Sequence, residues 1–152
     1  MNPDLERLIQ LQRVESELKR VEAEREAIPR ALAEMEGRLA EERGRLDAAR
    51  ADLDTTQKAR RQHEQTVQDL EAKRSKYKGQ LMDVKTNKEY TAMLHEIEGV
   101  ERDIRAREDL ILGEMERGEG LAVEIKREEE SFKQAEERHR AESRVCGHPE
   151  IR

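Results

Sequence analysis

Residue types that could carry chemistry are few in this chain, and their spacing does not assemble a reactive site. The sequence has one cysteine, Cys146, and four histidines among 152 residues. A structural zinc ion usually needs four ligands, and Cys146 with His148 supplies only two. His63, His95 and His139 have no partner at a spacing that would predict a nucleophile and its base. The sequence therefore predicts no enzyme, with no catalytic, cofactor-binding or metal-binding residue.

Basic residues are more informative, because they gather near the middle of the chain. Between Thr56 and Tyr90 there are nine lysines and arginines against five acidic residues, whereas the whole chain has a net charge of −6. A local positive excess of this kind can contact phosphate or an acidic protein surface. The candidate phosphate contacts are Lys73, Arg74 and Lys76.

The composition does not suit a compact globular domain that would hold such residues in a pocket. Charged residues make up 43% of the chain, hydrophobic residues 34% and aromatic residues only 2%. Long helices are typical of such a composition when an apolar period is present. No apolar run is long enough to span a membrane, and the start at Asn2-Pro3-Asp4 does not resemble a signal segment. We therefore expect a cytoplasmic protein without membrane insertion.

An apolar period of three and four residues runs from Leu11 to Val84. Sixteen of its 22 positions are apolar, and no step is skipped. Leu11 and Leu18 take heptad position a, and Val14 and Val21 take position d. A disordered chain has no reason to keep such a phase, so the pattern predicts a coiled-coil seam.

A second seam runs from Tyr90 to Glu142, with ten of 16 positions apolar. Its phase differs by one residue from that of the first seam, and the residues between Val84 and Tyr90 are turn-like. The change of phase predicts an antiparallel hairpin in which facing residues have numbers that add to about 174. Arg60 would then face Glu114. A straight parallel dimer is the alternative.

The predicted fold is an all-α, long antiparallel coiled-coil hairpin. Pro29 should kink or break the first arm, because proline removes a backbone donor and crowds the preceding turn. The expected segments are an N-terminal helix over 1–28, arm one over 29–84, a tip turn over 85–89, arm two over 90–144 and an irregular tail over 145–152. In this register the apolar stripe of residues 1–28 has no partner on the chain, so a homodimer could form through it.

The segment from Tyr77 to Glu98, which reads YKGQLMDVKTNKEYTAMLHEIE, carries a family resemblance. It resembles the hairpin tip of bacterial zinc-ribbon coiled-coil proteins, and Leu8-Ile9-Gln10-Leu11-Gln12 and Ile28-Pro29 resemble that family's first helix. The resemblance covers about residues 5–142. It implies a long helical hairpin, followed in the family by a zinc ribbon with two CxxC pairs. This sequence has no CxxC pair, so zinc is expected only with such a ribbon.

The resemblance implies a non-catalytic adaptor. Family members contact the sigma factor of the enhancer-dependent RNA polymerase, flagellar or secretion export components and, in one case, messenger RNA. The predicted function is therefore a scaffold that presents its tip to a protein partner, with RNA binding by the basic tip or a purely structural homo-oligomer as alternatives. The residues predicted to bind the partner are Lys78, Lys85, Thr86, Asn87, Lys88 and Glu89.

Overall fold

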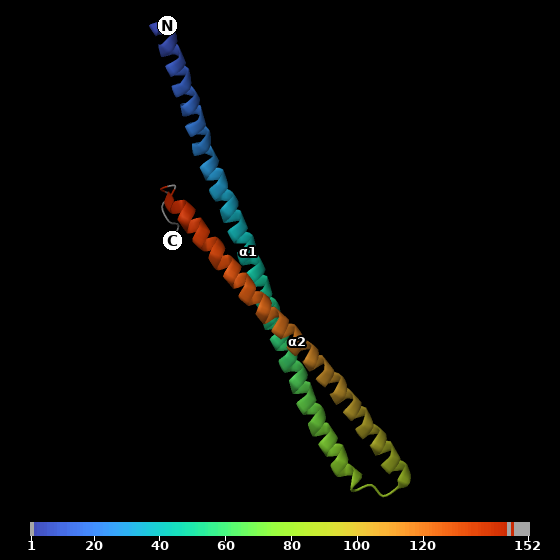
Figure 1. The fold of residues 1–152 in the computed structure, drawn as a ribbon. Helices are drawn as coiled ribbons and strands as arrows, with labels where there is room; N and C mark the ends of the chain where they lie inside the picture. Colours follow the sequence, from blue (N-terminus) through green and yellow to red (C-terminus); the bar gives the residue numbers. More distant parts are fainter. Residues whose placement is uncertain (1, 146, 148–152) are drawn as a thin grey trace. The chain divides into compact units, whose positions relative to one another are not determined.

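The computed structural model describes residues 2–145 and residue 147, which form two helices and no strand in that part of the chain. Helix α1 spans Pro3–Leu81 and helix α2 spans Asn87–Val145 (Figure 1). The two helices pack against each other as an all-α hairpin, which confirms the predicted fold class. Neither described helix is long and apolar enough to cross a membrane.

The helix ends follow from local capping. The side-chain oxygen of Asn2 accepts a hydrogen bond from the backbone N–H of Asp4 at 3.2 Å, and Pro3 takes the first helical position. At the other end of the chain, Gly147 has a positive φ of 68° and donates its N–H to the carbonyl of Arg144 at 3.3 Å. Glycine adopts this left-handed conformation without the Cβ clash, so it ends α2 just after Val145.

Helix α1 is continuous through Pro29, so the predicted break there does not occur and residues 1–28 do not form a separate helix. Pro29 cannot donate to the carbonyl of Arg25, which costs helix stability. Residues 22–30 are all exposed, and water can therefore solvate the carbonyl that lacks its donor.

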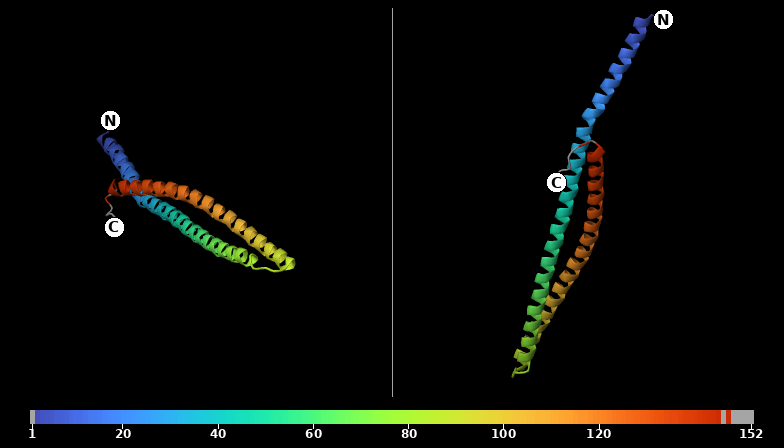
Figure 2. Two further views of the ribbon diagram at one scale, coloured as in Figure 1. Left: turned by 90° about the horizontal axis from the view of Figure 1, so that it is seen from below. Right: turned by 90° about the vertical axis from the view of Figure 1, so that its left-hand side faces the viewer.

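The chain divides into two compact units, which are described separately. Unit 2 comprises residues 46–127, where the two helices run side by side in both views of Figure 2. Its core consists of one layer of seam residues from each helix, namely Leu46, Ala49, Thr56, Ile97, Val100 and Ile104. Gly118 lies across the seam from Thr56, because a Cβ on it would lie 3.8 Å from Thr56 Cγ2. The residue numbers of Thr56 and Gly118 add to 174, in agreement with the predicted register.

Both predicted seams are correct over nearly all of their paired length. From Leu32 to Val84 every predicted position is buried or half-buried except Arg60, where Ala59 is half-buried instead. In α2 only the two ends differ, since Tyr90 and Glu142 are exposed and Ser143 is buried. Such small drifts are expected because 3.6 residues per turn do not match a strict heptad.

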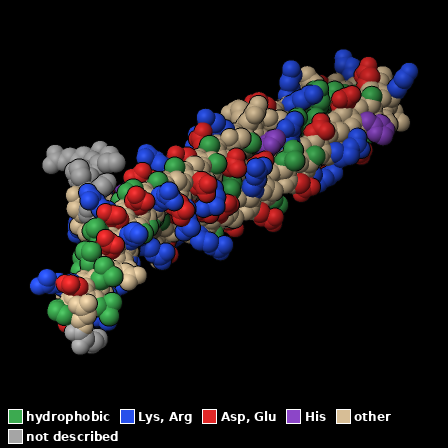
Figure 3. Space-filling model, turned by 90° about the horizontal axis from the view of Figure 1, so that it is seen from above, with side chains coloured by type: hydrophobic (Ala, Val, Ile, Leu, Met, Phe, Trp, Pro, Cys, Tyr) green, Lys and Arg blue, Asp and Glu red, His purple; other side chains and the backbone are tan. Residues whose placement is uncertain are grey.

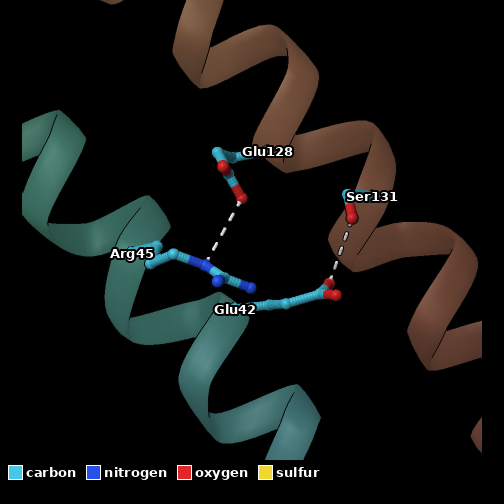
Figure 4. Close-up of polar contacts among 4 residues, drawn as sticks. All are labelled: Glu42, Arg45, Glu128 and Ser131. Carbon is cyan, nitrogen blue, oxygen red and sulfur yellow. Dashed lines mark hydrogen bonds and ion pairs between the residues drawn. The ribbon is translucent and has the colours of Figure 1, made fainter.

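Unit 1 comprises residues 1–45 and 128–152, and polar contacts join its two helical segments. Arg45 Nε lies 3.9 Å from Glu128 Oε2, and Ser131 Oγ donates to Glu42 Oε2 at 3.4 Å (Figure 4). Exposed ion pairs at such distances contribute little stability. Among the described residues of unit 1, the buried side chains are Leu32 and Ser143.

The N-terminal part of α1 in unit 1 has an exposed apolar stripe. Its large side chains are 40–63% exposed, namely Leu5, Leu8, Ile9, Leu11, Val14, Leu18, Val21 and Ile28. Hydrophobic side chains are visible at this end of the chain in Figure 3, and charged side chains of both signs are spread along the rest of the visible face among further hydrophobic ones. The sequence thus correctly predicted that the hairpin leaves this stripe uncovered.

Candidate functional site

The tip of unit 2 is the connection between α1 and α2, and backbone hydrogen bonds define both of its edges. The last turn of α1 tightens, because Met82 N–H bonds to Gly79 at 3.2 Å and Asp83 N–H bonds to Gln80 at 3.0 Å. These bonds join residues three apart, as in a 3₁₀ turn that often ends an α-helix. The connection is therefore short and closely held to the helix that precedes it.

Thr86 starts α2 as its N-cap. Its side-chain oxygen accepts a hydrogen bond from the Glu89 backbone N–H at 3.3 Å, and its carbonyl accepts from Tyr90 N–H at 3.0 Å. Asn87 and Lys88 are thus the first helical residues. The cap satisfies one of the N–H groups that a helix start leaves without a partner.

The connection lies at residues 82–86, three residues earlier than the predicted turn at 85–89. Arm one likewise ends at Leu81 instead of residue 84, and arm two begins at Asn87 instead of residue 90. The change of seam phase located the turn only coarsely. The sequence Thr86-Asn87-Lys88-Glu89 has the pattern of a capping box, and that signal would have placed the helix start correctly.

The predicted partner-binding residues fall into two groups. Lys85, Thr86, Asn87, Lys88 and Glu89 are all exposed around the connection. Lys78 lies apart from them on α1, where its Nζ is 3.6 Å from Glu101 Oε1 on α2. Only the first group is presented as a contiguous surface, although the hydroxyl and backbone of Thr86 already serve the helix cap.

The candidate phosphate contacts are also dispersed. Lys73 places its ammonium 5.5 Å from the centre of the Tyr77 ring, which is a favourable cation–π distance. Arg74 occupies a seam position and is half-buried, and Lys76 is exposed. Of the three, Lys76 is the residue whose side chain neither lies in the seam nor stacks on a ring in the described structure.

Helix pairing changes the charge of the tip. The facing segment of α2, residues 91–118, has eight acidic and four basic residues, against nine basic and five acidic residues over 56–90. The two segments together carry no net charge. The positive excess read from one arm is therefore neutralised by its partner arm, so long-range attraction of a polyanion is weaker than the sequence of that arm indicates.

A shallow hollow of about 480 Å³ lies beside the connection, within unit 2. Its apolar surface comes from Val84, Ala92 and Met93. Its polar residues are Gln80, Asp83, Glu89 and Glu96. Three carboxylates around an apolar floor suit a protein surface with an apolar side chain and neighbouring cations better than they suit phosphate.

Histidines in the described structure make pairwise contacts and do not form a reactive cluster. Arg107 Nη1 lies 3.0 Å from His63 Nδ1, which must accept this bond because a guanidinium only donates. His95 Nδ1 lies 3.7 Å from Glu98, and His139 Nε2 lies 3.5 Å from Glu36. No group of three metal-ligating side chains occurs among the described residues. Cys146 and His148 lie outside them.

Comparisons with protein-family models, with curated proteins and with solved structures give no match for this chain. A functional assignment therefore depends on the geometry of the tip and on the sequence resemblance of the segment around it.

Proposed function

We propose that the protein is a non-catalytic adaptor that presents the tip of its helical hairpin to a protein partner. The observation that carries this proposal is the combination, at one end of unit 2, of five exposed consecutive residues and a hollow with an apolar floor. The hydrogen bonds of the cap and of the last turn of α1 restrain the connection, and such restraint lowers the entropy lost on binding.

The resemblance supplies candidate partners, because zinc-ribbon coiled-coil proteins with a similar tip segment contact a sigma factor or export components. Lys85 and Lys88 are the residues proposed to contact acidic groups of the partner. They are exposed, on the connection and in the first turn of α2 respectively. RNA is the less favoured ligand, since residues 56–118, which form the tip half of the hairpin, carry no net charge and carboxylates line the hollow.

Charge reversal at the tip tests the proposal. The double variant Lys85→Glu/Lys88→Glu should lose at least about 90% of its binding to a purified sigma factor or export component, because close charge pairs across an interface are sensitive to reversal. Helicity from circular dichroism should not change. The matched control is Lys126→Glu/Lys133→Glu, which reverses two exposed lysines of α2 outside the tip.

Two results would count against protein binding through the tip. One is wild-type binding that the tip variant retains in full. The other is salt-sensitive filter binding of RNA that only the tip variant loses, which would favour the RNA-binding alternative.

A further inference from the structure

The exposed stripe of α1 has the geometry of an unfilled coiled-coil seam. Leu11, Val14, Leu18 and Val21 occupy successive a and d positions and are 52–63% exposed. Leucine and valine at these positions normally insert between side chains of a facing helix. The stripe lies on a long uninterrupted helix, so its geometry is present before any partner binds.

This stripe continues an interface that already exists. The same heptad phase leads through Ile28 to Leu32 and Met35, and Leu32 is only 7% exposed beneath α2. Ile28, Leu32 and Met35 line a hollow of about 230 Å³ in unit 1, together with Glu142 of α2. A helix seated on the stripe would therefore extend the row of side chains that α2 packs against.

The flanks of the stripe are acidic between Leu11 and Arg25, where all four e and g positions are glutamate. The e and g positions beside the four apolar residues are Glu15, Glu17, Glu22 and Glu24. Glu24 lies 3.9 Å from Arg20 on the same helix, and both of these side chains are exposed. Residues at e and g face the flanks of a partner helix and select it by charge.

A second copy of the chain does not satisfy these flanks. In a parallel pair, position g of one helix faces position e of the other, which places Glu17 opposite Glu22. In an antiparallel pair, e faces e and g faces g, so that glutamate again faces glutamate. Like charges across a coiled-coil interface act against the wrong partner.

We infer that the stripe is a docking site for a different helix, one with apolar a and d positions and with lysine or arginine at its flanks. Such a helix covers the stripe and pairs all four glutamates with cations. The site is separate from the proposed tip surface, so the chain has one surface for a basic amphipathic helix and another at the hairpin tip.

Designed peptides test this inference on the full chain by isothermal titration calorimetry. Two 28-residue peptides share isoleucine at a and leucine at d, and differ only in lysine or glutamate at every e and g position. The lysine peptide should bind one-to-one and at least about tenfold more tightly than the glutamate peptide. Raising the salt from about 0.05 M to about 0.5 M should weaken it, because exposed charge pairs are screened.

Matched variants assign the binding to the stripe. Leu18→Ser should abolish binding of the lysine peptide, whereas Leu112→Ser should not, although the two leucines are 56% and 58% exposed. Changing the four flanking glutamates to lysine should reverse the preference toward the glutamate peptide.

Three outcomes overturn the inference. Equal affinity for the two peptides would show that the flanks do not select a partner, and failure of both to bind would show that the stripe is not a seam. The third outcome would come from sedimentation of the chain without peptide. A mass that rises with concentration, and that Leu18→Ser reduces to the monomer, would make a second copy the occupant.

Discussion

Two stretches of α1 have the same apolar period, but one is exposed to solvent and the other is buried against α2. Leu11, Val14, Leu18 and Val21 are more than half exposed, whereas Leu46, Ala49 and Thr56 are 3–5% exposed against α2. Their flanks differ as well. The stripe has glutamate at the four e and g positions between Leu11 and Arg25, and the seam has Arg45, Arg50, Asp52 and Gln57. The period specifies an apolar face, and the flanking charges specify which helix covers it.

The largest expected effect comes from truncating one leucine in each stretch. Leu46 and Leu18 both occupy position a of α1 but are 5% and 56% exposed. Leu46→Ala should lower the free energy of unfolding by about 2–4 kcal/mol, because it removes buried methyl groups and leaves a cavity. Leu18→Ala should change it by less than about 0.5 kcal/mol, as is usual for surface substitutions. Urea unfolding followed by circular dichroism measures both.

Equal losses in the two variants would contradict the comparison, because they would mean that Leu18 is covered in solution. Repeating the measurement at several protein concentrations separates the two explanations. A concentration-dependent loss at Leu18 indicates association of copies through the stripe.

The fold itself was predictable from the sequence because a heptad pattern reports burial directly. The phase from Leu32 to Val84, and its change before Tyr90, indicated two paired arms and their register. The local details depend on competing side-chain contacts that the pattern does not contain. Arg60 was predicted to face Glu114, but its Nε lies 2.8 Å from Glu64 Oε1 one turn away on the same helix. A long side chain can choose either partner at similar free energy.

The next largest change in stability is expected from substituting the polar residues His63 and Arg107 inside the seam. His63 and Arg107 are seam residues of opposite helices, about one turn apart in register, and a part-buried hydrogen bond joins them. His63→Leu should cost about 1–2 kcal/mol, because it leaves the guanidinium without that acceptor. The double variant His63→Leu/Arg107→Leu should recover the loss or exceed wild-type stability. Urea unfolding of all four members of this double-mutant cycle gives the coupling energy.

An exposed pair provides the contrast for that cycle. Arg45 and Glu128 lie 3.9 Å apart, and the Arg45 side chain is 62% exposed. Breaking this pair with Arg45→Ala should cost no more than about 0.5 kcal/mol. If Arg45→Ala cost as much stability as His63→Leu, burial would not explain how much each of these two polar contacts contributes to the free energy of unfolding.

A stabilising effect is expected from a glycine on the seam. Gly118→Ala should raise the free energy of unfolding by about 1 kcal/mol, because alanine is the better helix former. The new methyl group would lie 3.8 Å from Thr56 Cγ2 and 3.9 Å from Leu53 Cδ1, both ordinary contacts. Gly120→Ala, which meets open space, is the matched control for helix propensity alone. The difference in melting temperature between the two variants measures the contribution of the new methyl group to packing. If Gly118→Ala were destabilising and Gly120→Ala were not, the two helices would lie closer together at Gly118 than these distances indicate.

The candidate site was less predictable than the fold. The exposed residues Lys85–Glu89 are predicted from a family resemblance and from local charge, and both can be read from the sequence without knowing how the helices pair. The hollow beside them requires Gln80 and Val84 from before the connection and Met93 from after it, so it exists only once the arms pair. The acidic residues of α2 that neutralise the basic residues of α1 are also in the sequence. Which basic residues they face depends on the register of the two helices.

The short connection at residues 82–86 also has a kinetic consequence. His63 and Arg107 are separated by 44 residues and Glu42 and Ser131 by 89, so contacts cost more loop entropy the further they lie from the connection. We expect the helices to begin pairing next to the Thr86 cap and then to zip outward one heptad after another. The folding rate should therefore respond most to substitutions near the connection, and the unfolding rate to substitutions near the chain ends.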